Sequence, residues 1–145
     1  MNYTRIVVAA VVATVVDALY GFLVWGMVLN GEFARYPAVY RLGENQSALP
    51  LMLIGVLVAM FFASWIYAHG YEGRGGLTEG LRFGALMGLF IGAYNAGVNY
   101  GTLRIGKRMA LTYGAGWIGE WLLVGLAIGL VYKAASRSAR SAAGV

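Results

Sequence analysis

The 145-residue sequence contains no cysteine, a single histidine and only 12% charged residues. Without cysteine the chain forms no disulfide and offers no thiolate to a metal or a substrate. His69 has no second histidine or cysteine with which to share a metal ion, so no metal site and no cofactor are expected. No serine or threonine hydroxyl has a histidine beside it within an apolar segment, so no catalytic residue is assigned and a non-enzymatic protein is predicted.

Charge is also too scarce for a soluble globular domain. Such domains carry roughly a quarter charged residues, whereas 60% of this chain is hydrophobic. A chain of this length cannot bury so much apolar surface within itself, so the predicted solvent is a lipid bilayer. The net charge of +5 comes from basic residues at the ends of apolar runs, where lipid headgroups explain them, and no nucleic-acid partner is expected.

Four apolar runs are long enough to cross the hydrocarbon core, for which a helix needs about 20 residues. They cover residues 6–29, 48–68, 80–103 and 110–132, and a short basic tail over 133–145 is expected to be frayed and solvated. The first run continues beyond Asp17 and lacks an A-x-A site, which favours a retained helix over a cleaved signal peptide. The prediction is a single all-α domain over residues 1–145, an integral membrane bundle of four transmembrane helices.

The two longer connections each allow two interpretations. In residues 30–47, apolar side chains recur at roughly helical spacing, with Pro37 suited to a first turn and Gly43 to a stop, which fits either a short interfacial helix or an ordinary loop. The side chains concerned are Phe33, Tyr36, Val39 and Tyr40. The glycine-rich residues 70–79 fit either a tight turn, which is favoured, or a phosphate-binding nest.

Glycine recurs every four residues in the third run, so one face of that helix has no side chains. This spacing predicts a packing face on which another helix backbone approaches closely. The series is Gly80, Gly84, Gly88 and Gly92, and the fourth run repeats it more weakly with Ala115/Gly119 and Gly125/Gly129. The partner is either another helix of the chain, which is favoured, or a second copy. Three tryptophans are expected to pack against glycine gaps, namely Trp25, Trp117 and Trp121.

Two acidic residues interrupt the apolar runs. Asp17 lies near the middle of the first run and Glu120 near the middle of the fourth, so antiparallel helices would place both carboxyls at similar depth. An acidic group there costs roughly 2.5 to 3.5 kcal/mol on insertion scales and is a functional candidate by default. No lysine or arginine lies at matching depth, so at least one carboxyl is expected to be protonated at neutral pH. The pair either forms a site that binds protons or cations, or it stabilises the packing of two helices by hydrogen bonds.

Two amides form a polar stripe on the third run. Asn95 and Asn99 are four residues apart and share a face with Gly88, Gly92 and Thr102. Such amides either form hydrogen bonds between helices or join the two acids in an ion or proton site.

The distribution of basic residues gives the orientation. With four spans, one side holds Arg5, Arg74, Arg82, Lys133, Arg137 and Arg140, and the other holds Arg35, Arg41, Arg104, Lys107 and Arg108. The positive-inside rule therefore favours both termini in the cytoplasm by one residue.

The stretches 19–26 (LYGFLVWG), 80–100 and 116–121 (GWIGEW) resemble uncharacterised small bacterial four-span inner-membrane proteins, grouped as domains of unknown function. The resemblance covers most of the chain and implies a bacterial inner-membrane location but no activity. The chain is also similar in style to small multidrug resistance transporters, which have four short spans, a first-span carboxylate (here Asp17) and glycine packing motifs. It departs from them in its long first connection and in Glu120.

Two functions follow from these features. The first is a non-enzymatic accessory or assembly subunit, which needs only the glycine faces, the polar groups and the first connection. The alternative is a small proton- or cation-coupled transporter or channel that uses Asp17 and Glu120. An enzyme acting on lipid has no nucleophile or metal constellation to support it. The expected partners are the lipid bilayer and either further copies of the chain or a larger membrane complex.

Overall fold

The computed structural model describes residues 2–41, 47–73 and 75–142, and this part of the chain is almost entirely helical and contains no strand. Its elements are α1 (Tyr3–Tyr20), the π-helix η1 (Gly21–Val28), α2 (Asn30–Phe33), α3 (Leu49–His69), α4 (Gly76–Thr102) and α5 (Lys107–Ala142). Four helical segments are long and apolar enough to span a membrane: Tyr3–Val28, Leu49–His69, Gly76–Thr102 and Lys107–Tyr132. The predicted four-helix, all-α bundle is confirmed, and the protein is a multi-pass membrane protein.

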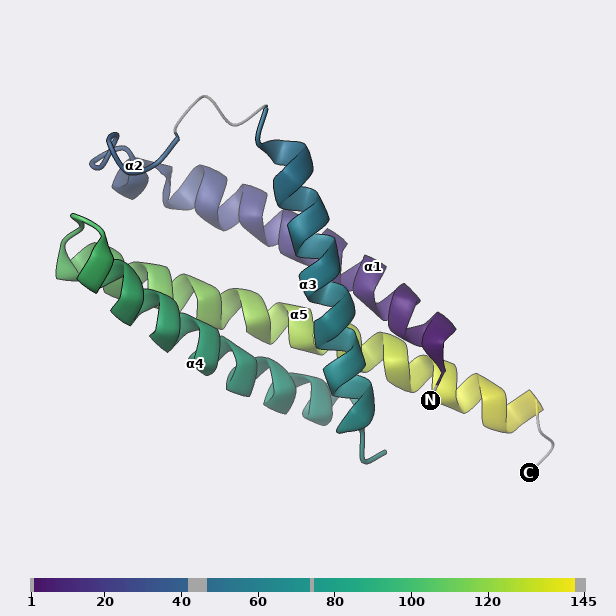
Figure 1. The fold of residues 1–145 in the computed structure, drawn as a ribbon. Helices are drawn as coiled ribbons and strands as arrows, with labels where there is room; N and C mark the ends of the chain where they lie inside the picture. The colour runs from purple at the N-terminus through teal and green to yellow at the C-terminus, as the bar shows by residue number, and fades with distance from the viewer. Residues whose placement is uncertain (1, 42–46, 74, 143–145) are drawn as a thin grey trace.

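The helices pack as a chain of neighbours rather than as a closed square. α4 lies along α5, α1 packs against α5, and α3 packs mainly against α1 (Figure 1). The start of α1 and the end of α5 lie toward one end of the molecule, together with the connection from α3 to α4 (Figure 1). We call this the terminal end, and the opposite end, with α2 and the turn from α4 to α5, the α2 end.

Two expectations need correction. The last helix continues to Ala142, so residues 133–142 extend α5 rather than forming a frayed tail. Six of these ten residues are alanine or arginine, which favour helix, and extending an existing helix needs no new nucleus.

In the first connection, α2 ends at Phe33, so Pro37 follows the helix instead of opening it, and Gly43 lies outside the described residues. The residue before a proline is disfavoured in the α conformation, which is consistent with a helix that stops before Tyr36. The apolar side chains of this connection pack against Ile105, in the turn before α5, and against Met109 and Ala110 at the start of α5.

The glycine series of α4 forms its contact with α5. Gly80, Gly84, Gly88 and Gly92 are all buried. A Cβ atom on Gly80 would lie 2.5 Å from the carbonyl oxygen of Gly125, and one on Gly92 would lie 2.6 Å from that of Gly114. A Cβ on Gly129 would lie 2.7 Å from the Cα of Gly80. The two backbones are therefore in direct contact, and the partner of the glycine face is another helix of the same chain.

Candidate functional site

The two intramembrane acids lie together between α1 and α5. Asp17 is 8% exposed and Glu120 is 3% exposed. The two side chains are close enough to interact with each other. Within the described residues no lysine or arginine forms an ion pair with either group.

The third polar group of this site comes from the π-helix η1. The indole Nε1 of Trp25 donates a hydrogen bond of 2.7 Å to Oε2 of Glu120. The hydroxyl of Tyr20, at the junction of α1 and η1, donates one of 2.8 Å to the backbone oxygen of Gly116. Residues five apart point in different directions on an α-helix, but the i to i+5 winding of a π-helix brings them close to one face. The winding of η1 thus aims both Tyr20 and Trp25 at α5.

A second glycine face on α5 receives these two rings. A Cβ atom on Gly116 would lie 2.8 Å from Cζ2 of Trp25, and one on Gly119 would lie 2.8 Å from the hydroxyl oxygen of Tyr20. This agrees with the expectation that Trp25 packs against a glycine gap. α5 therefore has two faces without side chains. One contacts the backbone of α4, and the other contacts the rings of Tyr20 and Trp25.

Aromatic rings cover the acid pair toward the α2 end. The centroid of the Trp25 ring lies 5.1 Å from that of Tyr113, 5.9 Å from that of Trp117 and 6.0 Å from that of Phe33. Phe33 in turn lies 4.7 Å from Tyr40. Burial, followed by the neighbouring Tyr113 and Tyr36, raises the pKa of the Tyr40 hydroxyl, which therefore stays neutral at physiological pH.

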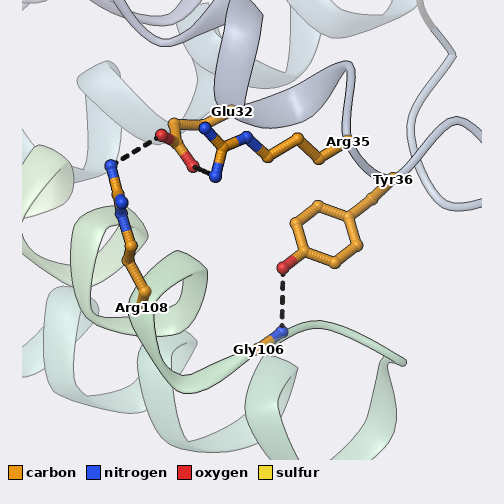
Figure 2. A network of polar contacts seen from close by, with 5 residues as sticks. All are labelled: Glu32, Arg35, Tyr36, Gly106 and Arg108. Carbon is orange, nitrogen blue, oxygen red and sulfur yellow. Dashed lines mark hydrogen bonds and ion pairs between the residues drawn. The ribbon is translucent and has the colours of Figure 1, made fainter.

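A network of polar contacts fastens this cover to the turn between α4 and α5 (Figure 2). Glu32 of α2 forms an ion pair of 2.9 Å with Arg108 of α5 and a second, at 3.5 Å, with Arg35. The backbone N–H of Gly106 donates a hydrogen bond of 3.2 Å to the hydroxyl of Tyr36. The first connection is therefore held on the bundle at this end by contacts distant in sequence.

The two amides of the predicted polar stripe lie apart from the acids. The side chain of Asn95 donates a hydrogen bond of 2.9 Å to the backbone oxygen of Ile91 in its own helix, and Asn99 is half-buried one turn further along α4. α4 contacts the face of α5 that carries Gly114 and Gly125, whereas Glu120 belongs to the face that carries Gly116. In the described part of the chain no hydrogen bond joins either amide to Asp17 or Glu120.

The remaining sequence candidates have local partners. Nδ1 of His69 lies 2.9 Å from the backbone oxygen of Trp65, and the described residues contain no group of three His, Asp or Glu side chains that could hold a metal ion. In the glycine-rich connection, the carboxylate of Glu79 accepts hydrogen bonds from the backbone N–H of Glu72 at 3.1 Å and of Gly75 at 3.3 Å. Those N–H groups serve a tight turn closed by the chain's own carboxylate.

Sequence reasoning missed the role of Tyr20 and the hydrogen bond from Trp25. The available signal is the segment Gly116-Trp-Ile-Gly119-Glu120, in which two glycines precede an intramembrane acid by one helical turn or less. Such a bare patch beside an acid favours a large side chain opposite it.

Comparisons of the chain with protein-family models, with curated proteins and with solved structures each found no match.

Proposed function

We propose that the protein is a small proton- or cation-coupled membrane transporter or channel whose binding site is the pair Asp17 and Glu120. The observation that carries this proposal is the proximity of two buried carboxyls that, among the residues the structure describes, have no ion-pair partner and receive one hydrogen bond, from the indole N–H of Trp25 to Glu120. Charged groups inside a membrane are costly and are kept where they face a pathway for ions or protons. A shared proton that a cation can displace is the chemistry such a pair offers.

The glycine faces support this choice over an accessory subunit. An accessory subunit would use bare helix faces to dock on a larger complex. Here Gly80, Gly84, Gly88 and Gly92 meet α5, and Gly116 and Gly119 meet Trp25 and Tyr20. Both glycine faces are thus occupied by the chain itself.

An accessory or assembly subunit is the second candidate, and one observation favours it. The first half of α3, residues 49–59, is exposed almost throughout, while its second half buries Met60, Ala63, Ser64 and Tyr67. A helix whose first half is largely exposed offers surface to a partner helix or to lipid.

We place the protein in a bacterial inner membrane with both termini in the cytoplasm. The choice of membrane is supported by the resemblance to small bacterial four-span inner-membrane proteins. The orientation is supported by the count of basic residues, which favours the terminal side by six to five. Labelling of single cysteines introduced at Tyr3 and at Val39 tests the orientation, because the two should react from opposite faces of the membrane.

Cation-driven proton release tests the proposed function. Addition of sodium, potassium or tetraethylammonium ions to the purified protein in lipid nanodiscs should release protons into a weakly buffered medium. The double variant Asp17→Asn/Glu120→Gln should release none, because neutral amides fill the same space without a titratable proton. Glu72→Gln, an exposed acid outside the spans, is the matched control and should release as the unaltered protein does.

The two candidates predict different results for the same variants. A transporter loses proton release in the double variant while the folded protein remains. Equal release from the unaltered protein and the double variant, or none from either, would refute the transport proposal. Stoichiometric recovery with a larger complex in mild detergent would then support the subunit.

A further inference from the structure

Basic side chains gather at the α2 end, around the turn from α4 to α5. Arg104, Lys107 and Arg108 lie within five consecutive residues, and all three are exposed. Arg35 of the first connection joins them through Glu32, whose carboxylate pairs with Arg35 on one side and with Arg108 on the other (Figure 2). Among the described residues at the surface of this end, Glu32 is the only carboxylate, so this surface carries an excess of positive charge. We call Arg35, Arg104, Lys107 and Arg108 the basic patch.

The four cations keep most of their hydrogen-bonding capacity. Although both pair with Glu32, the side chains of Arg35 and Arg108 remain 60% and 75% exposed. Within the described part of the chain, Arg104 and Lys107 form no ion pair and no side-chain hydrogen bond. A guanidinium has five N–H donors and an ammonium three, so one carboxylate leaves most of them for another acceptor. An anion with several oxygens, such as a phosphate, fits this set of donors.

The basic patch lies at the level of lipid headgroups. One candidate span ends at Thr102 and the next begins at Lys107, so the turn between them lies at the edge of the hydrocarbon core. Leu111, one helical turn further into the span, shares a face of α5 with Lys107 and is 70% exposed. Cations at headgroup level beside an exposed apolar side chain match the two parts of a phospholipid, its phosphate and its acyl chain.

The terminal end carries its basic residues in a different arrangement. They are spread over three helices, and two carboxylates lie at the same end. The bases are Arg5 on α1, Arg82 on α4, and Lys133, Arg137 and Arg140 on α5, and the acids are Glu72 and Glu79. The α2 end is therefore the better place for a single phosphate group, and the terminal end supplies a control of equal charge.

We propose that the basic patch binds the phosphate of an anionic phospholipid whose acyl chain packs along Leu111. The phosphate links Arg35, in the first connection, to Arg104 and Lys107, in and directly after the turn from α4 to α5. The bound lipid therefore adds to the contacts that hold the first connection, and with it the rings that cover the acid pair, on the bundle. This site stands on the charges and their position at the membrane surface, and it is independent of what the acid pair binds.

Native mass spectrometry of the full chain in mild detergent tests the proposal. The protein is titrated with phosphatidylglycerol and, separately, with phosphatidylcholine of the same acyl chains, whose headgroup has no net charge. A basic side chain near anionic headgroups contributes about fivefold in affinity, so phosphatidylglycerol should bind at least about tenfold more tightly. Equal binding of the two lipids would overturn the proposal. Binding of neither would also overturn it and would leave the patch to an acidic segment of a partner protein.

Two variants matched in charge locate the binding. Arg104→Gln/Lys107→Gln removes two charges of the basic patch without breaking an ion pair of the described residues, and it should weaken phosphatidylglycerol binding by about 25-fold. Arg5→Gln/Arg82→Gln removes the same charge at the terminal end. It should change the affinity by less than about twofold, because that end is farther away than a Debye length. Equal losses in both variants would show that only total charge matters and would overturn the site.

Two further measurements complete the test. Inorganic phosphate has no acyl chain and should not displace phosphatidylglycerol at equal concentration, whereas displacement would assign the patch to free phosphate and overturn the lipid site. Phosphatidylglycerol should also raise the unfolding temperature of the unaltered protein more than that of the single variants Arg104→Gln and Lys107→Gln. An equal rise in all three would overturn the proposal even if the double variant does not fold.

Discussion

Replacement of Gly80 by alanine should weaken the bundle, whereas the same change at Gly97 of the same helix should strengthen it. The Cβ of an alanine at position 80 would lie 2.5 Å from the oxygen and 3.2 Å from the carbonyl carbon of Gly125, both of them backbone atoms. At position 97 a Cβ would meet nothing within 4 Å. The two variants therefore share the chemistry of the substitution and differ only in what the added methyl group contacts.

The magnitudes follow from two opposing effects. Alanine favours the helical state over glycine by about 1 kcal/mol, and this gain applies at both positions. At Gly80 the two backbones must also separate by about 1 Å to reach ordinary contact, and overpacking of this kind costs typically 1–3 kcal/mol. We expect Gly97→Ala to raise the free energy of unfolding by up to about 1 kcal/mol, and Gly80→Ala to lie about 1–3 kcal/mol below it.

The assay is reversible unfolding in mixed detergent micelles, with helix content followed by circular dichroism as the denaturing detergent increases. Helix propensity is removed from the comparison because both sites lie within α4. If Gly80→Ala and Gly97→Ala unfold at the same detergent fraction, the close contact of α4 with α5 is not what stabilises the bundle.

Two further substitutions test the contacts around the acid pair. Arg108→Gln should lower the free energy of unfolding by less than about 1 kcal/mol at low salt and by nothing at high salt, because its ion pair with Glu32 is exposed and screened; a loss that persists at high salt, measured in thermal melts, would contradict this. Trp25→Phe should cost about 1–3 kcal/mol more than Trp117→Phe, because only Trp25 donates to the carboxylate of Glu120; equal loss in detergent unfolding would show that the rings and not the hydrogen bond matter.

The spans could be predicted because they depend on properties that the sequence carries locally. An apolar run of about 20 residues has one stable conformation in lipid, a helix, since every backbone group must be satisfied within the segment. The packing face of α4 could also be predicted, because the four-residue spacing alone puts Gly80 and Gly88 on one face of the helix. The ends of the helices could not be predicted where the chain leaves the lipid, because there the backbone can also bond to water. The segment after Lys133, which continues α5, is an example.

The surroundings of the acids could be predicted only in part. The depth of Asp17 and Glu120 followed from their positions in antiparallel helices. That Trp25 donates to Glu120 depends on the change from α to π winding at Gly21, and no local pattern in residues 17–28 distinguishes the two. A π-helix is less favourable by itself, so its formation here depends on tertiary contacts, among them the bare surface at Gly116 that admits the indole.

The two bare faces of α5 explain how such a short chain holds acids inside a membrane. The face that meets α4 brings two backbones into contact, and this fixes α5 without using any polar side chain. The other face is then free to accept Tyr20 and Trp25, whose rings exclude lipid while their polar atoms bond to Gly116 and Glu120. A side chain larger than glycine at position 116 would displace the indole and leave the carboxyl without its donor. The close contact with the backbone of α4 and the polar contacts of the site thus lie on different sides of one helix.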